Sequence, residues 1–218
     1  MTEPQSPFQF ATATYLTRIL NQQARNLAEL LQGLEECSDG SVFHHTFQSL
    51  GRHHFLTEGF SNDFAQWALA SCNQPGLAER LASLDIRDYP SLKDLRADLL
   101  RVMGEYAQLH PAESRLSAFE PFYFCESVEV TVPLSFQAES LAEFRDGVAR
   151  LSHSALNYHF IASRLRLHLG TNDFSNWLAK DLGLDSLARR VNRIDIYTNT
   201  IQSMQKKLIA LIDQEMAS

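Results

Sequence analysis

The 218-residue sequence has little cysteine and no cysteine pair at metal-binding or redox spacing. Its cysteines, Cys37, Cys72 and Cys125, are odd in number, which excludes a complete disulfide framework. Free thiols are typical of a reducing compartment, so we expect a cytoplasmic protein. The sequence also lacks an N-terminal signal segment and any apolar run long enough to span a membrane, and we expect no membrane association.

The chain has no excess of positive charge. Its 26 acidic residues outnumber the 19 lysines and arginines, and the formal net charge is −7. Nucleic-acid binding depends largely on clustered Lys and Arg that neutralise phosphates. The arginines between positions 164 and 193 are separated by apolar or acidic residues, so we expect no nucleic-acid partner.

The motifs of the large enzyme classes are missing as well. The sequence contains no glycine-rich phosphate or dinucleotide loop, no GxSxG nucleophile elbow, no HExxH pair and no kinase signature. These absences exclude the enzyme classes that the motifs identify. The sequence predicts no cofactor.

An internal repeat is the clearest feature that the sequence does contain. At an offset of 110 residues, nine of the 25 positions between 62 and 86 are identical, whereas about one or two matches are expected by chance. Small changes of offset extend the match over most of the chain. Shared ancestry explains this pattern, and we interpret the chain as a tandem duplication.

Helical periodicity dominates both copies. Apolar residues recur every three or four positions, and Asn26 and Ser140 have the spacing of helix caps. The opening of the first copy, residues 16–34, has helical spacing, whereas residues 128–132 of the second copy alternate like a strand. We predict a mainly α protein, with a small extended segment at the start of a repeat.

The proline-containing segment between the copies sets the expected domain boundaries. We expect a disordered N-terminal tail over residues 1–7, a helical repeat over 8–110, a linker over 111–121 and a second helical repeat over 122–218. The linker is short and partly apolar. The two repeats are therefore predicted to pack as one globule about a pseudo-twofold axis.

The repeated polar and aromatic residues are the candidate ligand-binding set. In one interpretation they are structural, because Asn and Asp at a helix start cap the helix and arginines pair with nearby acids. In the other, both copies line one cleft, where two carboxylates bind a cation or a polyol and two tryptophans form the floor of a sugar site. The candidates are Asn62, Asp63, Trp67, Arg80, Asn172, Asp173, Trp177 and Arg190.

Four histidines lie between positions 44 and 54, on a predicted helix capped by Ser41. His45 and His53 share one side of that helix. Neither has a His or carboxylate three or four residues away, the usual spacing of helical metal ligands. With Ser41 placed opposite Ser154, His159 does not align with His45. We therefore predict no metal, and a site formed by His45, His53 and His159 is the less favoured alternative.

The segment from Ser41 to Thr46, followed by Asn62-Asp63-Phe64 and Trp67, resembles an uncharacterised family of bacterial and archaeal proteins that is defined as a domain of unknown function. The likeness covers nearly the whole chain, and the family has no established activity from which catalytic residues could be inferred. Because members are encoded near glycosyltransferases and storage-sugar enzymes, the resemblance implies a link with carbohydrate metabolism. Phe47 stands where the family pattern has a further histidine, which weakens a metal site.

Two hypotheses about function follow from these patterns. The favoured one is a non-catalytic cytoplasmic binding or interaction module for a protein partner or a small polar ligand, with a homodimer as a further expected assembly. The alternative is an all-helical, metal-dependent enzyme with a heme-oxygenase-like bundle, which would use the histidine-rich helix.

Overall fold

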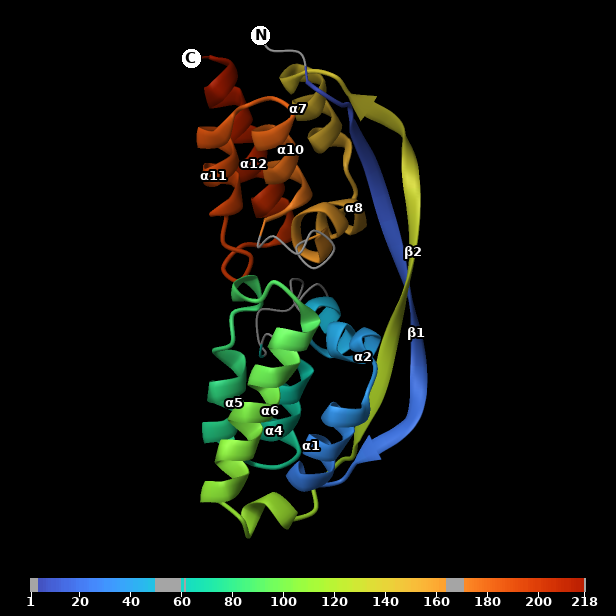
Figure 1. Ribbon diagram of the computed structural model, residues 1–218, viewed down its shortest axis with the longest axis vertical. Helices are drawn as coiled ribbons and strands as arrows, with labels where there is room; N and C mark the ends of the chain where they lie inside the picture. Colours follow the sequence, from blue (N-terminus) through green and yellow to red (C-terminus); the bar gives the residue numbers. More distant parts are fainter. Residues whose placement is uncertain (1–3, 50–59, 61, 164–170, 218) are drawn as a thin grey trace. The chain divides into compact units, whose positions relative to one another are not determined.

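The computed structural model describes residues 4–49, 60, 62–163 and 171–217 (Figure 1). Within these residues the protein is mainly helical, as predicted, and carries one antiparallel sheet of two long strands. Strand β1 spans Phe8–Ala24 and strand β2 spans Phe122–Ala138. No helix in the described part of the chain is both long and apolar enough to cross a membrane.

The helix predicted from the opening of the first copy is wrong over residues 16–24, which belong to β1. Leu16 and Ile19 are 58% and 72% exposed, so their helical spacing does not mark a buried face. Pairing with β2 decides the conformation, and the Arg18 guanidinium bonds the Glu126 carboxylate across the two strands. Strand formation depends on such cross-strand partners more than on local preference.

The chain divides into two compact units. Unit 1 consists of Met1–Thr14 and Glu129–Ser218, and unit 2 consists of Tyr15–Val128. Each strand is therefore divided between the units: β1 begins in unit 1 and continues in unit 2, whereas β2 begins in unit 2 and continues in unit 1. The first residues of each strand thus pack on helices that are distant in sequence.

Side-chain caps begin α1, α2, α4 and α6 of unit 2. Asn26, Ser38, Asn62 and Ser91 each accept a backbone N–H of the first helical turn, which satisfies a donor that the helix itself leaves unpaired. The described helices are α1 (Leu27–Glu36), α2 (Asp39–Phe43), the π-helix η1 (His44–Gln48), α4 (Asp63–Ala70), α5 (Pro75–Ala82), the 3-10 helix η2 (Ile86–Asp88), α6 (Leu92–Leu109) and the 3-10 helix η3 (Glu113–Arg115).

Unit 1 is built in the same way. Ser140, Ser152, Asn172 and Thr200 cap its helices through the same kind of bond. The described helices are α7 (Leu141–Arg150), α8 (His153–Asn157), the π-helix η4 (Tyr158–Ala162), α10 (Asp173–Lys180), α11 (Asp185–Asn192) and α12 (Ile201–Met216).

The strand starts supply phenylalanines to the core of each unit. In unit 1, Phe10 is fully buried and its ring overlaps the position that a Cβ on Gly147 would take. In unit 2, Phe124 is fully buried and stands 2.5 Å from the Cβ position of Gly33. Each glycine therefore makes room for a strand phenylalanine, which ties helices α7 and α1 to these strands.

The segments that precede the strands are also bonded to helices. Backbone N–H groups of Gln5 and Phe119 donate to the carbonyls of Asp181 and Ser71, respectively. The expected disordered tail at 1–7 therefore includes a hydrogen-bonded residue, and its residues 1–3 lie outside the described part of the chain. The expected linker at 111–121 includes η3.

Candidate functional site

The histidine-bearing segment of unit 2 starts as helix α2 and widens into the π-helix η1. A π turn contains one more residue than an α turn, and such turns are frequent at functional sites. His44 to Phe47 are all buried, and the His45 ring lies 4.6 Å from the Phe122 ring. The π-helix thus places His45 inside the aromatic core.

Both ring nitrogens of His45 have partners. Its Nδ1 lies 2.9 Å from Oδ2 of Asp63, and its Nε2 lies 3.0 Å from the backbone nitrogen of Cys125. A backbone N–H can only donate, so Nε2 accepts and carries no proton. The ring proton then resides on Nδ1 and is donated to the carboxylate, which fixes a neutral ring in one tautomer. The Ser49 hydroxyl donates to the other carboxylate oxygen of Asp63.

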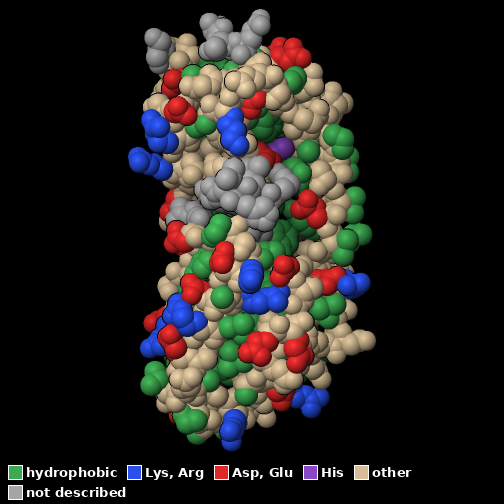
Figure 2. Space-filling model, viewed as in Figure 1, with side chains coloured by type: hydrophobic (Ala, Val, Ile, Leu, Met, Phe, Trp, Pro, Cys, Tyr) green, Lys and Arg blue, Asp and Glu red, His purple; other side chains and the backbone are tan. Residues whose placement is uncertain are grey.

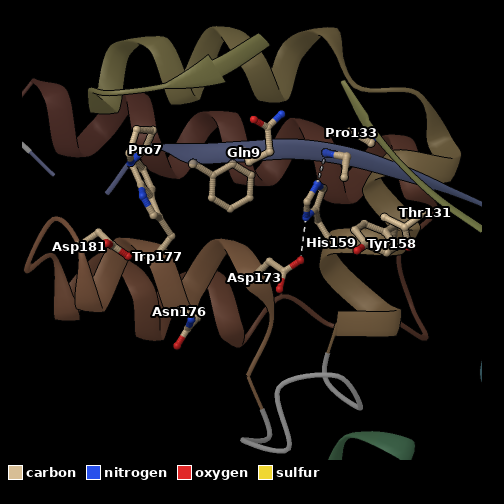
Figure 3. A pocket seen from close by; sticks show the side chains of 12 residues that line it. Pro7, Gln9, Thr131, Pro133, Tyr158, His159, Asp173, Asn176, Trp177 and Asp181 are labelled. Atoms are coloured by element: carbon tan, nitrogen blue, oxygen red, sulfur yellow. Dashed lines mark hydrogen bonds and ion pairs between the residues drawn. The ribbon is translucent and has the colours of Figure 1, made fainter. Parts of the chain in front are cut away.

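His159 of unit 1 has the same arrangement. Its Nδ1 lies 2.7 Å from Oδ2 of Asp173, and its Nε2 accepts the backbone N–H of Ala11 at 2.9 Å. Figure 3 shows His159 between the Asp173 carboxylate and strand β1. The His159 side chain is 3% exposed and the Asp173 side chain is 16% exposed, so the ring is shielded from water while the carboxylate is partly open to it.

The interpretation that His159 does not align with His45 is wrong. Each histidine is the second residue of a π-helix, and it bonds the aspartate that begins α4 or α10. The helix caps are Ser38 and Ser152, and not Ser41 and Ser154 as we expected. An offset of 114 residues, which also relates Asn26 to Ser140, pairs the two histidines.

A group that could hold a metal ion occurs in unit 2, where ligand atoms of His44, His45 and Asp63 lie within 4.8 Å of one another. His45 does not fit this role as it stands, because its Nε2 lone pair is used by Cys125 and its Nδ1 carries a proton. Nδ1 of His44 bonds the Ser127 hydroxyl. His53 lies outside the described residues.

The repeated asparagines join neighbouring helices. Asn62 caps α4 and donates to the Leu81 carbonyl in α5, whereas Asn172 caps α10 and donates to the Asn192 side chain in α11. They are 3% and 0% exposed. Their buried amides therefore have structural partners.

The repeated tryptophans hold the segments that lead into the strands. The indole N–H of Trp67 donates to the Glu120 carbonyl, and that of Trp177 donates to the Ser6 carbonyl, both at 2.8 Å. Trp67 is 7% exposed and Trp177 is 4% exposed. Little of either ring is open to a ligand.

The repeated arginines have different partners in the two units. Arg80 lies over the Tyr106 ring at 6.0 Å, whereas Arg190 donates to Gln214 and pairs with Glu215 on α12. These contacts tie α5 to α6 and α11 to α12. Each candidate of the repeated set thus contacts groups within its own unit.

A pocket of about 430 Å³ lies beside the His159–Asp173 pair in unit 1 (Figure 3). The starts of β1 and α10, the π-helix η4 and the middle of β2 enclose it, and Asp173 and Trp177 are the predicted candidates that reach it. No lysine or arginine is among its lining residues. Besides His159, the polar lining side chains are Gln9, Thr131, Tyr158, Asp173, Asn176 and Asp181.

Sequence comparison of the copies could not have identified three of these residues. Asn176 and Asp181 correspond to Gln66 and Ser71 at the offset of 110, so neither is repeated. Gln9 lies in a strand segment that only the fold brings to the pocket.

In Figure 2, acidic and basic side chains are interspersed over the visible face of the described residues, without a continuous basic patch.

Comparison with known proteins identifies the family. The solved structure of OrfY from Thermoproteus tenax matches with a TM-score of 0.86 and 32% sequence identity, covering 100% of this chain and 99% of that chain. No curated protein matches the sequence. The sequence matches the family of unknown function DUF5752 over residues 5–213. With residues 5–213 matched and a structural relative that spans the whole chain, this protein belongs to the DUF5752 family.

Proposed function

We propose that this protein is a non-catalytic binding module whose ligand site is the pocket in unit 1. The observation that carries the proposal is the complete use of both histidine rings. His45 and His159 are buried groups of a type suited to acid–base chemistry, and the Nε2 lone pair of each accepts a hydrogen bond from a strand N–H. To act as a base, either histidine would first have to break its hydrogen bond to the strand N–H.

We further propose that the module arose by duplication of one repeat, over residues 8–110 and 122–218, joined by the linker 111–121. The paired elements support this origin, because α1 and α7 have ten residues each and the two strands have 17 each. A pseudo-twofold arrangement of the repeats remains part of the proposal. The three free thiols favour a reducing, cytoplasmic location.

The lining of the pocket favours a small, neutral polar ligand such as a polyol. Amide, hydroxyl and carboxylate groups can exchange hydrogen bonds with ligand hydroxyls. The two carboxylates, Asp173 and Asp181, and the lack of lining lysine or arginine disfavour an anion such as a sugar phosphate. The volume lies within the usual range for small-molecule sites, roughly 300–1,000 Å³. The family resemblance adds the proposed link with carbohydrate metabolism.

Calorimetric titration with neutral polyols and sugars, and with their phosphate esters, tests this proposal. We expect a neutral compound to bind, and Asn176→Ala to weaken its binding about fivefold, because one hydrogen bond contributes about 1 kcal/mol. Gln66→Ala changes the corresponding position of unit 2 and is the matched control, with affinity unchanged. Preferential binding of the phosphate esters, or equal losses in the two variants, would contradict the proposed site.

The alternative, a metal-dependent enzyme, is favoured by one observation, the proximity of His44, His45 and Asp63. Elemental analysis of protein purified without chelators decides between the hypotheses. We expect no stoichiometric iron, manganese or zinc. A stoichiometric metal that is lost in the variant His44→Ala, with the fold retained, would favour the enzyme and overturn the binding module.

A further inference from the structure

Residues 5–11, which include the start of β1, are held against the rest of unit 1 by three hydrogen bonds of their backbone. Gln5 donates its N–H to the Asp181 carbonyl, Ser6 accepts from the indole of Trp177, and Ala11 donates to His159. Phe8 and Phe10 lie between these bonds, and their side chains are 6% and 0% exposed. An extended peptide is thus held both by its backbone and by alternate side chains, which is the usual basis of strand-type recognition.

A second segment docks on unit 2 by the same set of bonds. Phe119 donates to the Ser71 carbonyl, Glu120 accepts from the indole of Trp67, and Cys125 donates to His45. The phenylalanines between them, at positions 122 and 124, are 5% and 0% exposed. Two different segments therefore satisfy one set of contacts.

These contacts define which segment a unit accepts. The two phenylalanines are separated by one residue, so both point to the same face of the extended chain. The glycines Gly147 and Gly33 leave room for the second ring. The residue between the rings is exposed in both segments: Tyr123 is 55% exposed, and the Gln9 amide donates to the Leu134 carbonyl of β2. A small residue, Ala11 or Cys125, follows and presents its N–H to the histidine. The recognised pattern is Phe-X-Phe-small.

We propose that each unit is a receptor for an extended Phe-X-Phe segment, and that unit 1 can take residues 5–11 from a second copy of this chain. Within one chain, this segment is joined to residues 129–218 of unit 1 only through the whole of unit 2. The same segment of another chain would make identical contacts. Such an exchange loses only the effective concentration that the covalent link provides.

The test uses the full-length variant Phe8→Ala/Phe10→Ala, in which the docking segment is present but lacks its two anchors. We expect its Tm to be lower by more than about 10 °C, because two large buried side chains are removed. A synthetic peptide of residues 4–14 added in excess should restore most of that loss. The same peptide with alanine at positions 8 and 10 should restore none.

Two further peptides test the backbone bond and the bond made by the residue between the phenylalanines. N-methylation of residue 11 removes the donor for His159 and should weaken binding about fivefold, as expected for one lost hydrogen bond. Gln9→Ala removes the side-chain amide that donates to the Leu134 carbonyl of β2 and should weaken binding by a similar factor. Should the double variant not melt cooperatively, Phe10→Leu replaces it in the same assay.

Exchange between whole chains is measured by sedimentation of wild-type protein refolded at increasing concentrations. We expect a dimer fraction that rises with concentration and that falls when the residue 4–14 peptide is present during refolding. A folded variant that neither binds nor is stabilised by the wild-type peptide would overturn the receptor. A wild-type chain that stays monomeric at every concentration would overturn the exchange between copies.

Discussion

The two units surround their histidines with the same groups but present different groups to solvent. His45 and His159 each bond an aspartate and a strand N–H. Around the second pair, unit 1 has Asn176 and Asp181, where unit 2 has Gln66 and Ser71. The comparison teaches that the histidine–aspartate pair belongs to the architecture, and we propose that ligand specificity resides in the unmatched residues beside it.

The largest effect is expected from removing the histidines one at a time. His159→Ala removes the partner of the Ala11 N–H and one partner of the Asp173 carboxylate, and it opens a cavity, which should lower the free energy of unfolding by about 3–5 kcal/mol. His45→Ala should give a loss of similar size, because its partners are equivalent. Urea denaturation measures both.

The outcome of this pair of variants decides whether the comparison holds. Losses that agree within about 1 kcal/mol support a shared structural role, since mutational effects at equivalent buried sites vary by about that amount. If either alanine variant loses less than about 0.5 kcal/mol, the value typical of surface positions, that histidine is not a structural residue.

A smaller effect is expected at the glycines under the strand phenylalanines. Gly147→Ala places a methyl group against the Phe10 ring and should lower stability by about 1–3 kcal/mol, the usual range for overpacking. Phe10→Leu combined with Gly147→Ala should recover part of the loss, which a double-mutant cycle by thermal unfolding detects. Gly104→Ala is the control, because its Cβ position has no neighbour within 4 Å. Strictly additive effects would contradict the contact.

The smallest effect concerns acid sensitivity in unit 2. Hydrogen bonds from Tyr89 and Arg101 hold the pKa of Asp98 below its usual value. The folded state therefore binds this proton less readily than the unfolded state, so the associated stability is present above the ordinary pKa of Asp and is lost as the pH falls below it. Wild type should exceed Asp98→Asn in stability at pH 6 and approach it near pH 3. A difference that is constant with pH would contradict this account.

The sequence predicted what depends on local patterns. The caps Asn62 and Asn172 were expected from an Asn placed before an acidic and an aromatic residue, and both cap their helices. Helix starts and apolar stripes carry their own signal, so the mainly α prediction was correct.

What the sequence did not predict depends on contacts between distant segments. Strand β1 has helical spacing through Leu16 and Ile19 and becomes a strand because β2 pairs with it. The equivalence of His45 and His159 was hidden by a one-residue change of offset that only the π-helices make visible. The docking of each strand start on helices distant in sequence has no local signature at all, because the phenylalanines alone do not specify which helices receive them.

The protonation state of the two buried histidines tests the central claim most directly. Long-range proton–nitrogen correlation spectra of ring-labelled protein at pH 7 distinguish the two neutral tautomers from the imidazolium ion. We expect His45 and His159 both to be neutral, with the proton on Nδ1 and an unprotonated Nε2 that accepts from the strand. A proton on Nε2 of either ring would contradict the account, because that ring would then be free of its strand and available for chemistry.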